Sequence, residues 1–276
     1  MGLRINTNIA SQEVQKNLKL SNAQQEAEFE KLSSGKRISK ASDDAAGLAI
    51  ATKMGSEVRG LRVASRNAND AISLVQTAEG ALNETSNIIT RLREISVQAA
   101  SDTVGDSERG FLSLEYEQLV QEADRISKTT SFNGKPLLDG TGKTLSFQIG
   151  TSADPNNQID LDTTMTDASS EALGINNTDV RSKAGASGNL KKLDDALYRV
   201  SAYRAGFGSV QSRLQTSVNN LEVSALNQDA ARSRIEDVDY AESTAKAAAA
   251  QIRNAAGSAT LAQANQMGAN ALRLIG

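Results

Sequence analysis

The chain has 276 residues and a formal net charge of −3, and only 3% of its residues are aromatic. It has no Cys and no His, which excludes disulfides, thiol nucleophiles, Cys/His zinc sites and imidazole acid–base chemistry. The charge balance lacks the basic footprint of a nucleic-acid-binding protein. No stretch approaches the ~20 apolar residues of a membrane span, and no signal-peptide-like run follows Met1. We expect neither nucleic acid nor membrane as a partner, and no cofactor.

The first segment, residues 3–33, carries apolar residues in a sparse, helix-like pattern. A single helix of this kind is marginal in water unless it packs against something else. We therefore expect the segment to take part in assembly, through Ile5, Ile9, Val14 and Leu18.

The strongest periodic signal runs from residue 54 to residue 99. Its packing positions recur alternately four and three apart over about six heptads with one stammer, which predicts a long coiled-coil-like helix. Upstream, Ser42, Asp43 and Asp44 supply an N-cap and first-turn acids. The candidate packing residues are Val58, Leu61, Ile72, Val75, Leu82, Ile89 and Leu92.

A second helix is expected after Gly105, capped by Asp106 or Ser107. Its packing face is Leu112, Tyr116, Leu119, Ala123 and Ile126. The short connection favours an antiparallel arrangement with the preceding helix.

The centre, about residues 130–185, is irregular. Leu145, Phe147 and Ile149 alternate with polar residues, which predicts a strand with one buried face. After a turn, residues 158–161 form the returning strand of a small β-hairpin. The segment 185–188 (GASG) is interpreted as a linker.

A third long helix is expected from about Asn189, with Leu197, Leu214 and Leu221 among its packing residues. The predicted fold class is therefore mainly α. It is a long antiparallel coiled-coil-like helix bundle with a small central β-hairpin region, and the N- and C-terminal helices are paired.

The last segment, residues 241–275, is rich in Ala, which favours helix and allows close approach of backbones. Its candidate assembly residues are Ile252, Leu261 and Leu272. Neither end buries much surface alone. We expect both ends to pack against each other and against neighbouring molecules, and to become fully ordered only in a polymer.

Several segments resemble bacterial flagellin. The resemblance covers both ends of the chain, in order, and its motifs are long and specific. The segments are INTNI (5–9), LSSGKRISKASDDAAGLAI (32–50), DRI (124–126), FNG (132–134), ARSRIEDVDYA (231–241) and LAQANQ (261–266).

The resemblance implies a domain plan. Residues 1–40 and 236–276 would form a terminal helical core domain, the inner tube of a filament. Residues 41–235 would form a rod domain of three long helices, with the β-hairpin region at about 130–185. Because the centre is short, the chain looks like a minimal flagellin without the outer variable domains.

The resemblance also implies a function. The chain is expected to be a non-enzymatic structural subunit that polymerises into the bacterial flagellar filament used for swimming motility. It would be secreted by flagellar type III export without a cleaved signal and would be extracellular. Its implied partners are other flagellin subunits, filament cap and hook-junction proteins, and an export chaperone that docks near the C-terminal end.

A Toll-like receptor of the host is a further implied partner. Many flagellins are recognised along the segment that corresponds here to residues 90–98. Arg91 and Glu115 coincide with family contact positions, whereas Ile95 stands where Leu is usual and Thr90 where Gln is usual. The alternative is that Arg91 and Glu115 are only contacts between subunits.

Three other classes of protein share some of these features. A hook–filament junction protein shares the terminal helices, but such proteins usually depart from the RSRIED pattern that is intact at 232–237. A flagellin with a metalloprotease insert needs an HExxH motif, and this chain has no His. A soluble coiled-coil adaptor would explain the rods but not the terminal motifs.

Overall fold

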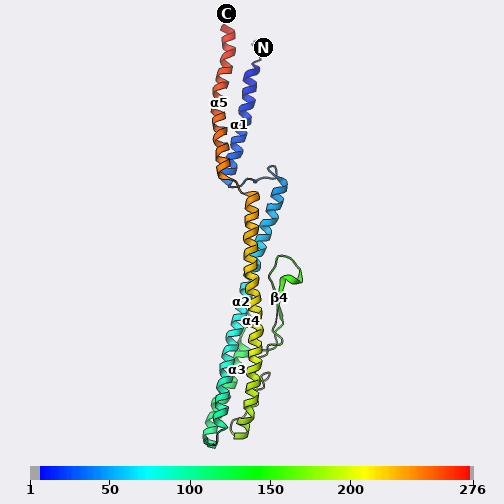
Figure 1. Ribbon diagram of the computed structural model, residues 1–276, viewed down its shortest axis with the longest axis vertical. Helices are drawn as coiled ribbons and strands as arrows, with labels where there is room; N and C mark the ends of the chain where they lie inside the picture. Colours follow the sequence, from blue (N-terminus) through cyan, green and yellow to red (C-terminus); the bar gives the residue numbers. More distant parts are fainter. Residues whose placement is uncertain (1–6, 274–276) are drawn as a thin grey trace. The chain divides into compact units, whose positions relative to one another are not determined.

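The computed structural model describes residues 7–273, and side chains up to residue 266. Figure 1 shows a mostly helical chain with short strands between the third and fourth helices. The predicted fold class is confirmed. The helices are α1 (Ile9–Ser34), α2 (Ala45–Ala99), α3 (Asp106–Thr129), α4 (Lys183–Glu236) and α5 (Tyr240–Arg273). The strands are β1 (Ser131–Phe132), β2 (Lys135–Pro136), β3 (Thr144–Gln148) and β4 (Gln158–Asp162), with a 3₁₀ turn η1 (Pro155–Asn157) before β4.

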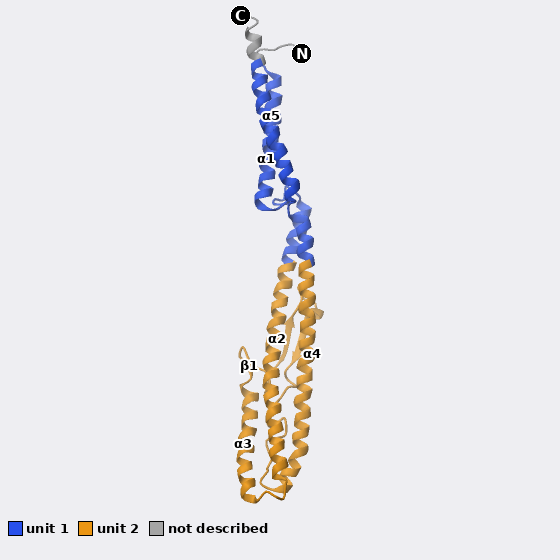
Figure 2. Ribbon diagram, turned by 60° about the vertical axis from the view of Figure 1, so that its left-hand side comes forward, with its two compact units in different colours: residues 1–56, 227–276 blue, residues 57–226 orange. Residues whose placement is uncertain are grey.

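The chain divides into two compact units, coloured separately in Figure 2. Unit 1 comprises residues 1–56 and 227–276, and unit 2 comprises residues 57–226. The predicted functional domains, with boundaries at residues 40 and 236, stay a prediction.

In unit 2, α2, α3 and α4 lie side by side (Figure 2). Ion pairs join neighbouring helices: the Arg91 Nη2–Glu115 Oε1 distance is 2.8 Å between α2 and α3, and the Arg93 Nε–Asp194 Oδ1 distance is 2.7 Å between α2 and α4. At the α2–α3 turn, Arg109 Nε donates to the Ala99 carbonyl at 2.9 Å. These contacts bring α3 back along α2, as the short connection predicts.

Most of the predicted packing residues lie in the buried interior of unit 2. The side chains less than 10% exposed are Val58, Leu61, Ile72, Val75, Leu82, Ile89, Leu92, Leu214 and Leu221. Leu112, Leu119 and Leu197 are only partly buried, at the edge of the interior.

The packing face of α3 agrees in part with the prediction. Tyr116 and Ala123 are buried as predicted, together with Ser113 and Val120, whereas Leu112, Leu119 and Ile126 are only partly buried. Tyr116 supplies the bulk, and its hydroxyl donates to Thr178 Oγ1 at 2.8 Å. An apolar pattern misses Ser113 because a small polar side chain gives no hydrophobic signal.

The helix starts differ in part from those predicted. Asp44 caps α2 as expected, accepting a hydrogen bond from the Gly47 N–H at 2.9 Å. The prediction that Asp106 or Ser107 caps α3 is wrong. Gly105 is the N-cap, and no side-chain hydrogen bond caps the helix. The interpretation of residues 185–188 as a linker is also wrong, because α4 begins at Lys183 and Ala186 is fully buried.

The predicted β-hairpin is present as β3 and β4. The antiparallel register pairs Leu145 with Leu161 and Phe147 with Ile159, so the apolar side chains share one face. Ile159 and Leu161 are buried, whereas Leu145 and Phe147 are partly buried against the helices. A smaller hairpin, β1–β2, turns at Asn133 and Gly134, both with positive φ, as a tight hairpin turn requires.

In unit 1, α1 and α5 lie side by side, and short segments join them to the remaining helices (Figure 1). The segment that follows α1 pairs with the segment at the junction of α4 and α5. The Arg37 N–H donates to the Glu236 carbonyl at 2.7 Å, and the Val238 N–H donates to the Gly35 carbonyl at 3.0 Å. Gly35 has φ +70°, the left-handed conformation that ends α1. Ile38 is buried beside this pairing, 2% exposed.

Among residues 7–273, no helix is both long and apolar enough to cross a membrane.

Candidate assembly surfaces

The contact between α1 and α5 is lined by small and polar side chains. Ala247, Ala250 and Ala264 of α5 are buried, and Ser11 of α1 is 6% exposed. A Cβ added at Gly257 would lie 3.1 Å from Leu18 Cδ1, so the Leu18 side chain packs directly over this glycine. Such a seam holds the helices close together but buries little apolar surface.

Polar contacts set the register of this helix pair. Asn8 Nδ2 donates to the Ala264 carbonyl at 2.9 Å, and Ser11 Oγ donates to Asn265 Oδ1 at 2.8 Å. Nearer the other end, Asn254 Nδ2 donates to Gln25 Oε1. A one-turn slip would unpair these groups, so they favour a single antiparallel alignment.

Several large apolar side chains of the pair face solvent. Ile9 is 59% exposed, Leu20 56%, Phe29 51% and Ile252 70%. In a self-sufficient helix pair the large apolar residues would lie in the seam and the small polar ones outside. Here these four large apolar residues lie outside the seam, so a large part of the apolar surface of the pair stays exposed to solvent.

The predicted terminal assembly residues are thus divided between seam and surface. Val14, Leu18 and Leu261 are half-buried, whereas Ile9 and Ile252 are exposed. Ile5 and the side chain of Leu272 lie outside what the structure describes. Sequence reasoning missed Leu20.

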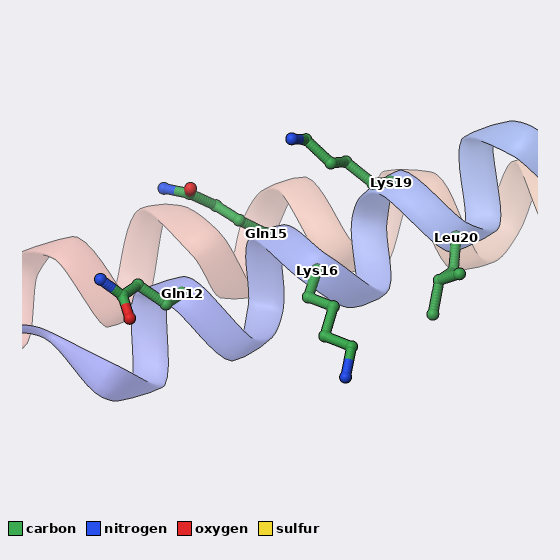
Figure 3. A pocket seen from close by; sticks show the side chains of 5 residues that line it. All are labelled: Gln12, Gln15, Lys16, Lys19 and Leu20. Carbon is green, nitrogen blue, oxygen red and sulfur yellow. The ribbon is translucent and has the colours of Figure 1, made fainter.

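One hollow of about 440 Å³ lies on the surface of α1, lined by Gln12, Gln15, Lys16, Lys19 and Leu20. Figure 3 shows all five side chains projecting from α1 with α5 behind it. The hollow is an open part of the helix surface and has no buried polar group that would identify a small ligand. Among the described residues no group of three or more acidic side chains is arranged to hold a metal ion.

The candidate receptor residues lie in unit 2. The Arg91 guanidinium contacts Glu115 Oε1 from Nε at 3.0 Å and from Nη2 at 2.8 Å, and Nη1 contacts Glu94 at 3.0 Å. The Glu115 carboxylate is the main cause that raises the pKa of Arg91 above its ordinary value. Arg91 and Glu115 therefore present one paired, half-exposed surface.

Ile95 is placed differently from the prediction. It is 1% exposed and belongs to the interior shared by the three helices. Its assignment as a receptor contact is wrong for this folded chain, because a partner that approaches the surface cannot reach a fully covered side chain.

Comparison with known proteins identifies the family. Residues 5–143 match the bacterial flagellin N-terminal helical region, and residues 190–275 match the bacterial flagellin C-terminal helical region. The chain belongs to the flagellin family.

The similarity to known proteins covers nearly the whole of this chain. A flagellin of Halalkalibacterium halodurans is 41% identical over 271 residues, covering 98% of this chain and 99% of its own length. The flagellar filament 33 kDa core protein of Treponema phagedenis is 39% identical, with 98% and 99% coverage. The crystal structure of Bacillus cereus flagellin is 34% identical, with a TM-score of 0.51, and covers 56% of this chain and 88% of that one.

The predicted identity as a flagellin is confirmed by these matches, and with it the function of a structural filament subunit. The alternative of a hook–filament junction protein is not favoured, because relatives similar along the whole chain are flagellins and filament core proteins.

Proposed function

We propose that this flagellin polymerises through the outer surface of the α1–α5 pair, which becomes the inner tube of the extracellular flagellar filament used for swimming. The observation that carries this proposal is the burial pattern of unit 1. The fully buried seam positions are Ala and Ser, Leu18 and Leu261 are only half-buried, and Ile9, Leu20, Phe29 and Ile252 face outward. Burial of these side chains against neighbouring copies would supply apolar stabilisation that the isolated pair lacks.

The difference in burial between the two units also supports the domain plan. Residues 1–40 with 236–276 are proposed as the assembly domain, and 41–235 as a rod domain. The rod helices bury Leu82, Ile89, Leu92 and Leu214 completely, which supports folding of the rod without neighbours. We assign the chain no enzymatic role, since the flagellin family is a structural one.

Other partners are proposed on the family relationship alone. They are the filament cap, the hook-junction proteins and an export chaperone at the C-terminal end. For a Toll-like receptor, the exposed Arg91–Glu115 pair supports a contact at residues 90–98, without Ile95. The competing role for that pair is a contact between subunits.

Deletion of residues 241–276 tests the assembly proposal. We expect the shortened chain to remain a monomer, to keep the helical circular dichroism signal of the rod, and to form no filaments in electron micrographs. The reason is that α1 has lost its partner α5, which carries half of the outer surface of the pair. The full-length chain, seeded with filament fragments under the same conditions, is the control. Normal filaments from the shortened chain would refute the proposal.

A further inference from the structure

Unit 2 contains a groove of about 380 Å³ between α2 and the two β-hairpins. Its α2 wall is formed by Asn67, Asp70, Ala71 and Leu74, whose spacing keeps them on one helix face. Ala71 and Leu74 are buried, so the floor of the groove is apolar. We call this depression the hairpin groove.

Two aromatic side chains form the facing wall of the hairpin groove. Phe132 belongs to β1 and Phe147 to β3, so each hairpin brings one ring to it. Both side chains are only partly buried, although Phe is among the residue types most often fully buried. Each ring therefore keeps apolar area that a ligand can cover.

The rim of the hairpin groove carries two charges of opposite sign. Asp70 of α2 and Lys135 of β2 are exposed, and neither side chain forms an ion pair or a hydrogen bond within residues 7–273. An ionised carboxylate only accepts hydrogen bonds, and an ammonium group only donates them. The rim thus offers both kinds of partner to a ligand.

The edge of β3 adds main-chain groups. The Ile149 N–H donates to the Asn157 carbonyl at 2.8 Å on the β4 side, whereas the Gln148 carbonyl accepts from Asn67 Nδ2 at 3.2 Å on the α2 side. Because these directions alternate along an antiparallel strand, the N–H and carbonyl of Ser146 also point away from β4. Ser146 lines the hairpin groove, so one more donor and one more acceptor lie at its wall.

This combination of groups favours one class of ligand. A lipid calls for an apolar pocket without charges, and a phosphate group calls for several cations, whereas Lys135 is the one basic residue that lines the hairpin groove. A sugar has apolar C–H faces, which suit the two rings, and hydroxyl groups that donate and accept, which suit the rim. The exposed Asn133 amide, also at the groove, matches an acetamido substituent in its donor and acceptor.

We propose that the hairpin groove binds 2-acetamido sugars. The rings of Phe132 and Phe147 cover a sugar face, and Asp70, Lys135 and the main chain of Ser146 bind its hydroxyl groups. Such sugars occur both in bacterial cell walls and on host glycoproteins, so the shared chemistry is the acetamido ring. The site is separate from polymerisation through α1 and α5 and goes beyond the proposed function.

The test titrates the full-length monomer with defined saccharides, followed by saturation-transfer NMR and calorimetry. Chitotriose represents the N-acetylglucosamine of bacterial walls, and N-acetyllactosamine represents host glycoproteins. Maltotriose, which has no acetamido group, is the control ligand. We expect saturable binding of at least one acetamido probe with a dissociation constant of about 1 mM or tighter, and at least about tenfold weaker binding of maltotriose. The tighter of the two acetamido probes identifies the source.

Substitutions locate the binding in the groove. One variant carries Asp70→Ala with Lys135→Ala, two exposed positions whose replacement should leave the fold intact. A second carries Phe132→Leu, which keeps apolar bulk but removes a ring. We expect each to weaken binding by about tenfold or more, and circular dichroism melts check that each folds.

The matched control carries Lys143→Ala with Asp160→Ala. These exposed positions of the β3–β4 region lie outside the hairpin groove, and the same two charges are removed, so binding should be unchanged.

Three results would overturn the inference. They are no saturable binding of either acetamido probe up to about 10 mM, equal binding of maltotriose, or undiminished binding in both groove variants. None of these measurements requires filaments, so failure of this inference is distinguishable from failure of the proposed function.

Discussion

Single residues of the rod show how strongly stability depends on burial rather than on residue type. Leu214 is fully buried and Ile72 is 8% exposed, whereas Leu226 on the same helix as Leu214 is 70% exposed. A buried leucine loses both its apolar burial and its packing contacts when it is shortened, while an exposed leucine loses little.

We expect Leu214→Ala and Ile72→Ala each to reduce the free energy of unfolding by about 2–5 kcal/mol, with the larger loss at Leu214. Urea denaturation followed by circular dichroism measures the change. Leu226→Ala is the matched control and should shift the free energy by about 0.5 kcal/mol or less. Equal effects at positions 214 and 226 would show that the rod interior is misassigned.

Asp124 joins α3 to the segment before α4. The Lys128 ammonium is the main cause that lowers the pKa of Asp124 below its ordinary value of 3.8, and hydrogen bonds from Ser170 act in the same direction. Because the folded pKa is the lower one, the carboxylate stabilises the folded chain above pH 3.8. That contribution is lost as the pH falls through the lowered pKa.

We therefore expect Asp124→Asn to cost up to about 1 kcal/mol at pH 7, the range of partly exposed ion pairs. The difference from wild type should close as the pH falls below about 4. Urea titrations at a series of pH values measure it, and Asp160→Asn, on an exposed strand position, is the control. A difference that stays constant down to pH 2 would contradict the role of the carboxylate.

At the scale of elements, the two helix pairs differ in what their seams bury. The α2–α4 contact buries Leu82, Ile89 and Leu214, whereas the α1–α5 contact buries Ala and Ser with hydrogen bonds across it. Apolar burial supplies most of the stability of a helix pair. The α1–α5 pair should therefore open more readily in the monomer.

Limited proteolysis of the monomer checks this expectation. We expect trypsin to cleave α1 at Lys16 and Lys19 and α5 at Arg253 first, and to leave a resistant core near residues 40–235. The rod, which also exposes lysines and arginines such as Lys192 and Arg213, serves as the internal control. Uniform resistance along the chain would contradict a weak α1–α5 seam.

If the outward apolar residues of unit 1 become buried on assembly, neighbouring copies stabilise the α1–α5 pair. We expect the amide protons of α1 and α5 to exchange slowly in filaments and rapidly in monomers, because burial in the polymer suppresses local opening. The amides of α2 and α4 around Leu82 and Leu214 should be protected in both states. Hydrogen exchange with mass spectrometry measures the difference, and equal protection of α1 in both states would refute it.

Much of the architecture follows from local patterns in the sequence. The spacing from residue 54 to 99 repeats often enough to predict one long helix, and it contains no proline to interrupt it. The alternation at Leu145 and Phe147 identified the strand of the hairpin. The resemblance in segments such as 32–50 and 231–241 indicated the family, which the comparisons confirm.

Tertiary structure alone decided which faces of these helices are covered. Ile95 and Arg91 lie four residues apart, yet Ile95 is inside and Arg91 is paired at the surface. Phe111 and Leu114 are exposed although their residue types suggest a core, whereas Ser113 on the same helix is buried. Periodicity determines that a residue is on a helix face, but the rotation of that face depends on contacts with helices distant in sequence. The seam of α1 and α5 has the same origin: Ser11 meets Asn265 only because the two ends of the chain come together.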